Sequence, residues 1–388
     1  MKRIFLIPLV GALILATACK KDDEPEHNTP PTPQPYVSPE IDTNYVLGQY
    51  QPTRRLATLT EEEEAQNFTW GVGESPLLLY VGADNQVSSI EYDNQKRQSL
   101  VNIPASLMGG AQVMRFNYNN DQLSTLQLTE TGGTTIFGAS ATCDGNRITS
   151  LTYNNVDESV IMGYLNNFLS SQRKDLVENI SVTNLQTTYT WTGSDVSSDH
   201  ITAQGSTDLA VGELVRFLNL DTSFYRMIIE NSGLGEQIPG ISPQLLADFV
   251  DMLADSTCHI VVDVDLTNSY TYDGHPNPLY GFWGWGFLGN TRVLSSHNIL
   301  SSQREGLASV NLSVNLPTTV PDRYDWTTRM MLTLALAYLN GQYPDGFHYT
   351  YPIDLDKTES NTYSYDNQGW PTSLLDSDNH LTTFTYEL

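Results

Sequence analysis

The chain has 388 residues, of which 39% are hydrophobic and only 16% are charged. Its 45 acidic residues outnumber 19 basic ones, so the formal net charge is −26. Nucleic acid and anionic membrane surfaces repel so acidic a chain, and neither is expected as a partner. Many Asn, Ser, Thr and Tyr residues separate the carboxylates, which is typical of extracellular β-rich proteins rather than disordered ones.

The chain begins with the pattern of an export signal. Lys2 and Arg3 precede an apolar run at 4–15, and small residues lead to Cys19. Residues 16–19, Ala-Thr-Ala-Cys, resemble the lipobox of bacterial lipoproteins. The resemblance implies that residues 1–18 are a removed signal peptide and that Cys19 carries a lipid anchor in the membrane. The alternative is an ordinary cleaved signal followed by an incidental cysteine.

An acidic, proline-rich stretch follows the cysteine. Residues 20–24 resemble the export signal of Bacteroidota that moves lipoproteins to the outer face of the outer membrane. This resemblance implies an outer-membrane protein that faces the cell exterior. Residues 20–39 cannot bury enough apolar surface to fold. We therefore expect 19–42 to be a lipidated cysteine with a disordered tether.

A short repeat runs through the remaining chain. Four copies align without gaps, at 84–92, 120–128, 145–153 and 378–386. A looser copy lies at 368–374, and a degenerate one at 198–202. The four gapless copies begin with Asp, Asn or Gly, which tolerate left-handed backbone angles and close tight turns. Alternating apolar and polar residues follow, as in a strand with one buried face. The repeats predict a mainly β (α+β) fold, an antiparallel meander built from hairpins.

The tyrosine-rich strands carry a family resemblance. Residues 270–273, Tyr-Thr-Tyr-Asp, and 363–366, Tyr-Ser-Tyr-Asp, resemble the Tyr-Asp-type β repeats of an uncharacterised domain in Bacteroidota lipoproteins. In that family an Asn-Pro turn, an aromatic segment and a Ser-x-Asn stretch follow, and residues 277–298 have this order. The resemblance implies no activity and no catalytic residues.

About four helices are expected to pack against the sheet, at 157–169, 209–218, 244–253 and 326–340. The last is apolar on nearly every side, which predicts deep burial against the sheet. A lobe boundary near Gly205 would divide the folded part into an N-terminal β-repeat lobe (43–205) and a helix-containing C-terminal lobe (206–388). The alternative is one sheet that runs through both halves.

The sequence assigns no catalytic residue, metal site or cofactor. It lacks the nucleophile elbow, phosphate loop and dinucleotide fingerprint. Two well-placed carboxylates would still suffice for a glycan-active hydrolase. Asp263 and Asp265 share one strand face, which is more typical of the hydrated side of a half-buried strand. Cys143 and Cys258 could pair in an oxidising compartment or be two buried thiols.

The strongest candidate for recognition is the aromatic segment 279–288. Tyr280, Trp283 and Trp285 alternate there with small glycines, and His297 follows. Exposed rings of this kind stack on sugars or on protein side chains. The alternative is a buried aromatic plug under the sheet. The sequence thus favours a non-catalytic module that binds a glycan or a protein; the alternatives are the hydrolase and a carrier of an apolar ligand.

Overall fold

The computed structural model describes residues 46–61, 64–72, 77–81, 87–103, 112–154, 178–210, 248–249, 252–253, 256–283, 291–342 and 344–387. The expected signal peptide, the lipid site at Cys19 and the tether lie outside these residues. So do Trp285 and the helix expected at 157–169.

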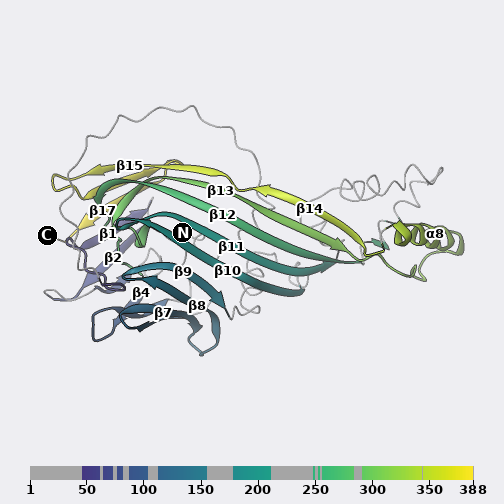
Figure 1. Ribbon diagram of the computed structural model, residues 1–388, viewed down its shortest axis with the longest axis horizontal. Coiled ribbons are helices and arrows are strands. Elements are labelled where there is room, and N and C mark those ends of the chain that lie inside the picture. Colours follow the sequence, from purple (N-terminus) through teal and green to yellow (C-terminus); the bar gives the residue numbers. More distant parts are fainter. Residues whose placement is uncertain are drawn as a thin grey trace.

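The described chain is mainly β, as predicted, with seventeen strands in one antiparallel sheet (Figure 1). The strands are β1 (Leu56–Glu61), β2 (Glu64–Trp70), β3 (Leu77–Val81), β4 (Val87–Tyr92), β5 (Gln98–Ile103), β6 (Gln112–Asn119), β7 (Gln122–Glu130), β8 (Thr135–Asp144), β9 (Arg147–Asn154), β10 (Glu178–Thr192), β11 (Asp195–Ala210), β12 (Thr257–Pro276), β13 (His297–Val314), β14 (Phe347–Asp354), β15 (Lys357–Tyr365), β16 (Pro371–Asp376) and β17 (Leu381–Tyr386).

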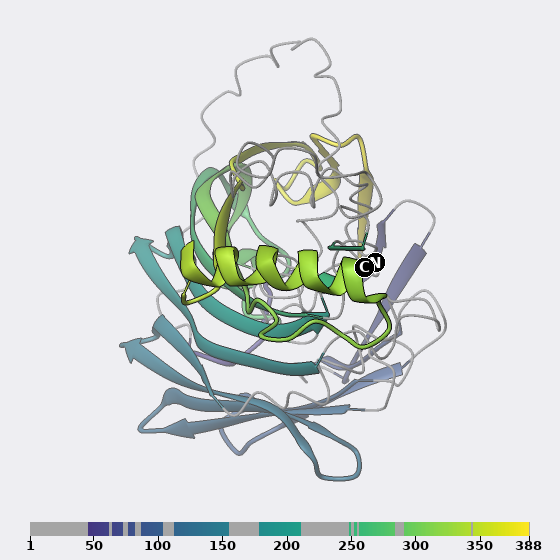
Figure 2. The ribbon, with the colours of Figure 1, turned by 90° about the vertical axis from the view of Figure 1, so that its right-hand side faces the viewer.

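The sheet closes on itself. Strand β1 pairs with β2 on one side and with β17 on the other. Strand β13 pairs with β14 over one part of its length and with β15 over another. All strands except β14 therefore form a continuous ring, which Figure 2 shows end-on. Closure gives every strand of the ring a partner on both sides over at least part of its length, which shields edges that would otherwise offer a template to other chains.

The repeats form hairpins for the predicted reason. Asn120, Asp121, Gly145 and Asn379 have positive φ angles of 48°, 62°, 57° and 64°, and each turn leads directly into a strand. The apolar residues that follow face the core and are buried, for example Leu126, Leu151 and Phe384.

The degenerate copy at 198–202 is not a turn. It lies inside β11, where Ser198 to Thr202 pair with β12 on one side and β10 on the other. The turn before it is at Gly193, whose φ is 62°. A polar Ser-Asp-His sequence fits this strand because Ser198 and His200 lie on its partly exposed face, whereas the buried Asp199 has hydrogen-bond partners inside. The short match at 198–202 was therefore misleading.

Strands β10 to β13 are much longer than the others, at 15, 16, 20 and 18 residues. They extend past the short strands toward one end of the molecule (Figure 1). In β12, Ile260, Val262 and Val264 are buried, whereas Asp263 and Asp265 point outward. Gly205 lies within β11 opposite Val262, and the sheet runs through both halves of the chain.

The largest core fills the inside of the ring where the short strands lie. It combines residues from β1 to β11, β16 and β17 with residues inserted from two loops: Leu47, Tyr50, Phe282, Trp283, Val293 and Leu294. The two loops are widely separated in the sequence, so the core joins segments that are far apart along the chain.

The expectation of about four helices was wrong for the described part of the chain. It contains one α-helix with defined ends, α8 (Trp326–Gln342), and a short 3₁₀ turn, η1 (Thr291–Val293). The helix expected from Leu209 does not begin there, because Leu209 and Ala210 pair with β12 as the end of β11. Within 244–253, Asp248, Phe249, Met252 and Leu253 have helical backbone. Within the described ranges, no helix combines the length and hydropathy needed to cross a bilayer.

Helix α8 begins as predicted, with Asp325 as its cap. The Asp325 carboxylate accepts hydrogen bonds from the backbone N–H groups of Thr327 and Thr328, at 2.9 and 3.2 Å. Its predicted deep burial against the sheet was wrong. Figure 1 places α8 beyond the ends of the long strands, at the end of the molecule opposite β1 and β17. Its buried face instead packs in a small separate core with Phe249, Met252, Leu253 and Val320.

Candidate functional site

The aromatic segment enters the ring through a tight turn after β12. The side chain of Asn277 holds this turn: its Oδ1 accepts from the Leu279 N–H at 2.9 Å, and its Nδ2 donates to the Ser295 carbonyl at 2.8 Å. The Gly281 N–H donates to the Val293 carbonyl at 2.8 Å. The segment before Phe282 is thereby fastened to the residues that precede β13.

Phe282 and Trp283 are core residues. Trp283 is fully buried; its ring lies 5.2 Å from the Phe116 ring and is stacked 6.1 Å from that of Tyr118. Phe282 meets Tyr50 and Phe68 at 5.2 and 5.8 Å. Both side chains therefore fill the interior of the closed sheet, as the interpretation of a buried aromatic plug predicted, and the Trp283 indole does not face solvent.

The buried side chain of Gln98 in β5 links this aromatic plug to the surrounding sheet. The Gln98 Nε2 donates to the Gly281 carbonyl at 2.7 Å, and its Oε1 accepts from the Trp283 N–H at 3.0 Å. One side-chain amide thus satisfies two backbone groups that burial would otherwise leave without partners. The residues around it gave no hint of this role, since the contact joins positions 98 and 283 across the fold.

His297 lies just outside the plug and is held by Asp195. The His297 Nδ1 is 2.7 Å from the Asp195 Oδ2, and the His297 backbone N–H donates to Oδ1 at 3.0 Å. The hydrogen bond to Asp195 raises the pKa of His297, and the charges of Asp195 and Asp273 add to this against the opposing effect of burial. The charged imidazolium is therefore favoured in the fold.

Serines surround this pair, but their geometry is not that of a nucleophile relay. The Ser296 Oγ lies 3.2 Å from the His297 Nδ1, the same ring nitrogen that binds Asp195. A serine nucleophile would need the opposite ring nitrogen as its base. Ser296 also donates to Asp195 at 3.1 Å and lies 2.6 Å from Ser194. The group joins the β10–β11 turn to the start of β13.

Tyr280 is half-buried beside this group. Burial raises the pKa of its phenol; the charge of Asp195 adds to this, and that of Arg147 opposes it. Tyr280 is thus a neutral phenol at all physiological pH values. Of the four predicted recognition residues, the structure brings Tyr280 and His297 near Asp195 and places Trp283 in the core.

A second polar group lies on the adjacent tyrosine strands. Tyr365 donates to the Asp273 carboxylate, and its ring stacks on the His275 ring at 3.9 Å. Asn298 donates to the Pro276 carbonyl at 3.2 Å. Burial raises the pKa of Asp273, although the hydrogen bonds from Tyr365 and the His275 N–H act in the other direction. The Tyr-x-Tyr-Asp and Ser-x-Asn motifs therefore contact each other as structural parts of one joint.

A buried carboxylate deeper in the ring was not predicted. Asp199 accepts hydrogen bonds from Asn268, Tyr270 and Thr291 at 2.7, 2.6 and 2.8 Å. The sequence marks Asp199 only as part of the degenerate repeat copy at 198–202, which gives no sign that its carboxylate is buried.

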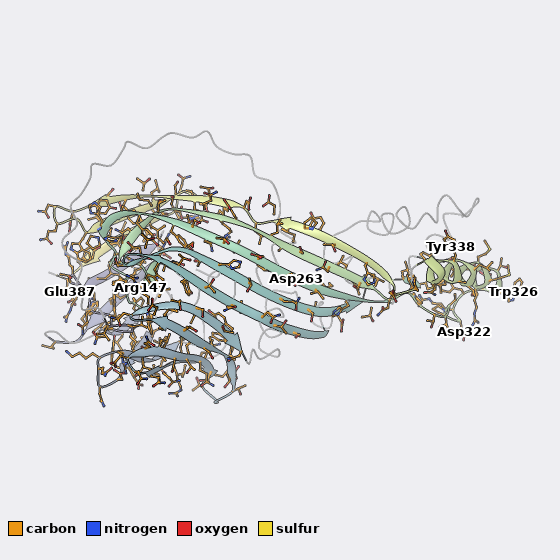
Figure 3. All side chains as sticks on the ribbon, in the orientation of Figure 1. Arg147, Asp263, Asp322, Trp326, Tyr338 and Glu387 are labelled. Carbon is orange, nitrogen blue, oxygen red and sulfur yellow. The ribbon has the colours of Figure 1, made fainter. Side chains whose placement is uncertain are left out.

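The two candidate carboxylates of β12 lie on the face of the strand opposite its buried residues, and Figure 3 labels Asp263 on the long strands. Asp263 accepts from Gln204 at 2.6 Å and from Asn311 at 3.0 Å, so it links three strands. Asp265 lies 2.7 Å from the His200 ring. Both belong to the hydrated side of the strand. The described residues contain no group of three or more His, Cys, Asp or Glu side chains placed to hold a metal ion.

Three of the exposed large apolar side chains in the described part of the chain lie on α8, which the sequence analysis did not predict. Trp326, Met330 and Leu334 are 76%, 43% and 60% exposed. They are spaced four residues apart and so lie on one face of the helix. Figure 3 places Trp326 at the tip of the molecule, opposite Glu387. In the sequence this exposed face is visible only as a helix that is apolar on nearly every side, a pattern that also predicts burial.

No protein-family model and no curated protein matches this sequence. Among solved structures, the chain is similar to a porin-like protein from Bacteroides vulgatus, with 10% identity, a TM-score of 0.25, and coverage of 86% of this chain and 99% of that chain. It is also similar to a porin-like protein from Bacteroides uniformis, with 8% identity, a TM-score of 0.17, and coverage of 88% of this chain and 100% of that chain. A third similar structure is the Photorhabdus luminescens Tc holotoxin pore, with 10% identity, a TM-score of 0.22, and coverage of 80% of this chain and 12% of that chain. Likenesses with TM-scores this low carry no argument for the fold or for the function.

Proposed function

We propose that the protein is a lipoprotein, anchored through Cys19 at the outer membrane and facing the cell exterior, that works as a non-catalytic binding module. Its binding surface is the exposed face of α8, and its partner is a protein. The observation that carries the proposal is the apolar stripe of Trp326, Met330 and Leu334 at one end of the molecule.

The position of α8 suits this role. The chain enters the ring at β1, which pairs with β17 at the end opposite α8 (Figure 1). A tether that leads into β1 would leave α8 directed away from the anchor. Apolar patches that stay exposed on a folded protein are typical of protein contacts.

The chemistry of the patch favours a protein over a glycan. Sugar recognition uses flat rings flanked by hydrogen-bonding side chains. The α8 face instead combines one indole with the flexible side chain of Met330 and the aliphatic Leu334. Of the aromatic residues that suggested glycan binding, Trp283 is inside the core, Tyr280 is half-buried and Trp285 lies outside the described residues. The hydrolase and the apolar-ligand carrier stay predictions from the sequence.

The anchor and the surface need separate tests. Cells that express the full chain would be labelled with a clickable palmitate analogue; label on the wild type and none on Cys19→Ala is the expected result. Protease added to intact cells should then degrade the protein, which would establish that it faces outward.

The binding surface would be tested by placing a photocrosslinking amino acid at position 326 in intact cells. The matched control is position 381, because Leu381 is 47% exposed on β17 at the other end. We expect a crosslinked protein adduct from position 326 and none from 381. Equal labelling from both positions would reject α8 as the binding surface.

A further inference from the structure

The exposed face of α8 is longer than its three large residues. Ala337 and Gly341 are also exposed, and at 100° per residue they fall in the same narrow arc as Trp326, Met330 and Leu334. The opposite side of the helix, with Leu332, Ala335 and Leu336, packs in the small core. Helix α8 therefore has two apolar faces, of which one is covered.

Side-chain size falls along the exposed face in one direction. It begins with the indole of Trp326 and continues through Met330 and Leu334 to Ala337 and Gly341. Nothing lies within 4 Å of a Cβ built at Gly341, so the small end is open. A face graded in this way is complementary to itself when turned end to end.

We propose that a second copy of this chain binds the exposed face of α8, so that two α8 helices pack antiparallel about a twofold axis. This inference rests on the proposed function and names its partner. With the axis between Thr333 and Leu334, Trp326 of one copy lies opposite Gly341 of the other. Met330 likewise lies opposite Ala337, so these two large side chains each meet a small residue, and Leu334 lies beside the axis opposite Thr333. Such self-complementarity is what a twofold interface requires.

The charges are compatible with this arrangement. The five residues of the face are all uncharged, so pairing removes no ionised group of theirs from water. The nearest basic residue, Arg329, has a partner of its own in Asp322. Antiparallel packing also sets the positive end of each helix dipole beside the negative end of the other.

The size of the contact sets its strength. A helix of 17 residues is about 25 Å long, and one face of it buries less than the ~1,200 Å² usual for stable complexes. We therefore expect a weak dimer, with a dissociation constant on the order of micromolar to tens of micromolar. Copies confined to one membrane would meet at a higher local concentration than copies in solution.

The test is sedimentation equilibrium of residues 20–388 from about 1 to 200 µM. The wild type should dimerise. Trp326→Ala removes the large side chain, and Gly341→Trp fills the space it needs, so each should weaken dimerisation at least about tenfold. The double variant again sets a large residue against a small one and should recover to within about threefold of the wild type. Unchanged circular dichroism would show that all variants fold.

The outcomes separate this inference from the proposed function. A wild type that stays monomeric to 200 µM, or single variants that dimerise as well as the wild type, would overturn the second copy as the occupant. If position 326 still crosslinks to a different protein in cells, α8 remains a binding surface with another partner. Cosedimentation with phosphatidylethanolamine and phosphatidylglycerol vesicles is the third arm. Vesicle binding lost in Trp326→Ala but kept in Gly341→Trp would make a lipid surface the occupant and overturn the dimer.

Discussion

The ring of His297 and the carboxylate of Asp195 are 2.7 Å apart, and this contact joins the start of β13 to the turn between β10 and β11. It also fixes the exit of the aromatic plug, because the residues just before His297 are tied to Asn277. Any change that neutralises the His297 imidazole should therefore weaken the contacts that keep the aromatic plug in place.

Stability should depend on pH through this pair. The raised pKa of His297 means that the fold binds its proton more tightly than the unfolded chain does. The stabilisation is complete below the ordinary histidine pKa of about 6.5 and is lost as pH rises through the raised value. We expect the free energy of unfolding to fall over this range in the wild type and to fall less in His297→Gln. Urea denaturation at several pH values measures this, with His200→Gln on the outer face as the control; parallel wild-type and His297→Gln profiles would contradict it.

The plug should carry much of the stability of its end of the ring. Trp283→Ala leaves a cavity between Phe116 and Tyr118 and should cost about 3–5 kcal/mol of unfolding free energy. Trp326→Ala changes an exposed side chain and should stay within about 0.5 kcal/mol. Similar losses from both, in denaturant titrations at low protein concentration, would mean that Trp283 is not held as described.

The long strands should tolerate no side chain at Gly306. A Cβ there would lie 2.4 Å from the Asp265 carbonyl oxygen and 2.8 Å from the Leu266 Cα, both backbone atoms. Gly306→Ala must push β12 and β13 apart and should destabilise the fold by about 1–3 kcal/mol. Gly132→Ala is the matched control, since nothing lies within 4 Å of its Cβ position. Equal midpoints of thermal unfolding for the two variants would refute the close contact.

Cys143 and Cys258 should react slowly. Both are free thiols, and burial raises the pKa of Cys143 to about 11 and that of Cys258 to about 12. Little thiolate is therefore present at pH 8. We expect native protein of residues 20–388 to react with Ellman's reagent at least about tenfold more slowly than free cysteine, and two equivalents to react at once in guanidinium. Rapid reaction of the native protein would contradict the burial.

Local patterns predicted the hairpins well. Turn residues such as Asn120 and Gly145, and the alternation after them, depend only on neighbours in sequence. Closure of the ring was beyond this reasoning, since the pairing of Leu56 with Tyr386 has no local signature. The lengths of β10 to β13 were also missed, because their polar outward residues broke the expected apolar runs.

The candidate site was predicted only in part. Aromatic residues between glycines fit both an exposed platform and a plug, and the choice depended on distant residues such as Gln98 and Tyr118. The apolarity of α8 indicated burial against the sheet. The helix instead lies at the tip of the long strands, where only one of its faces is covered. Sequence periodicity does not contain such tertiary placement.

The hydrogen bonds between β1 and β17 also set an order of events. Hairpins can form as soon as their two strands exist, but the ring cannot close before Leu381–Tyr386 are available. Contacts between segments so distant in sequence form slowly. Until then, β1 and β16 each present an unpaired edge that another open chain can join. Deleting the final strand would make both edges permanent, and such a chain should associate with its neighbours instead of completing its own sheet.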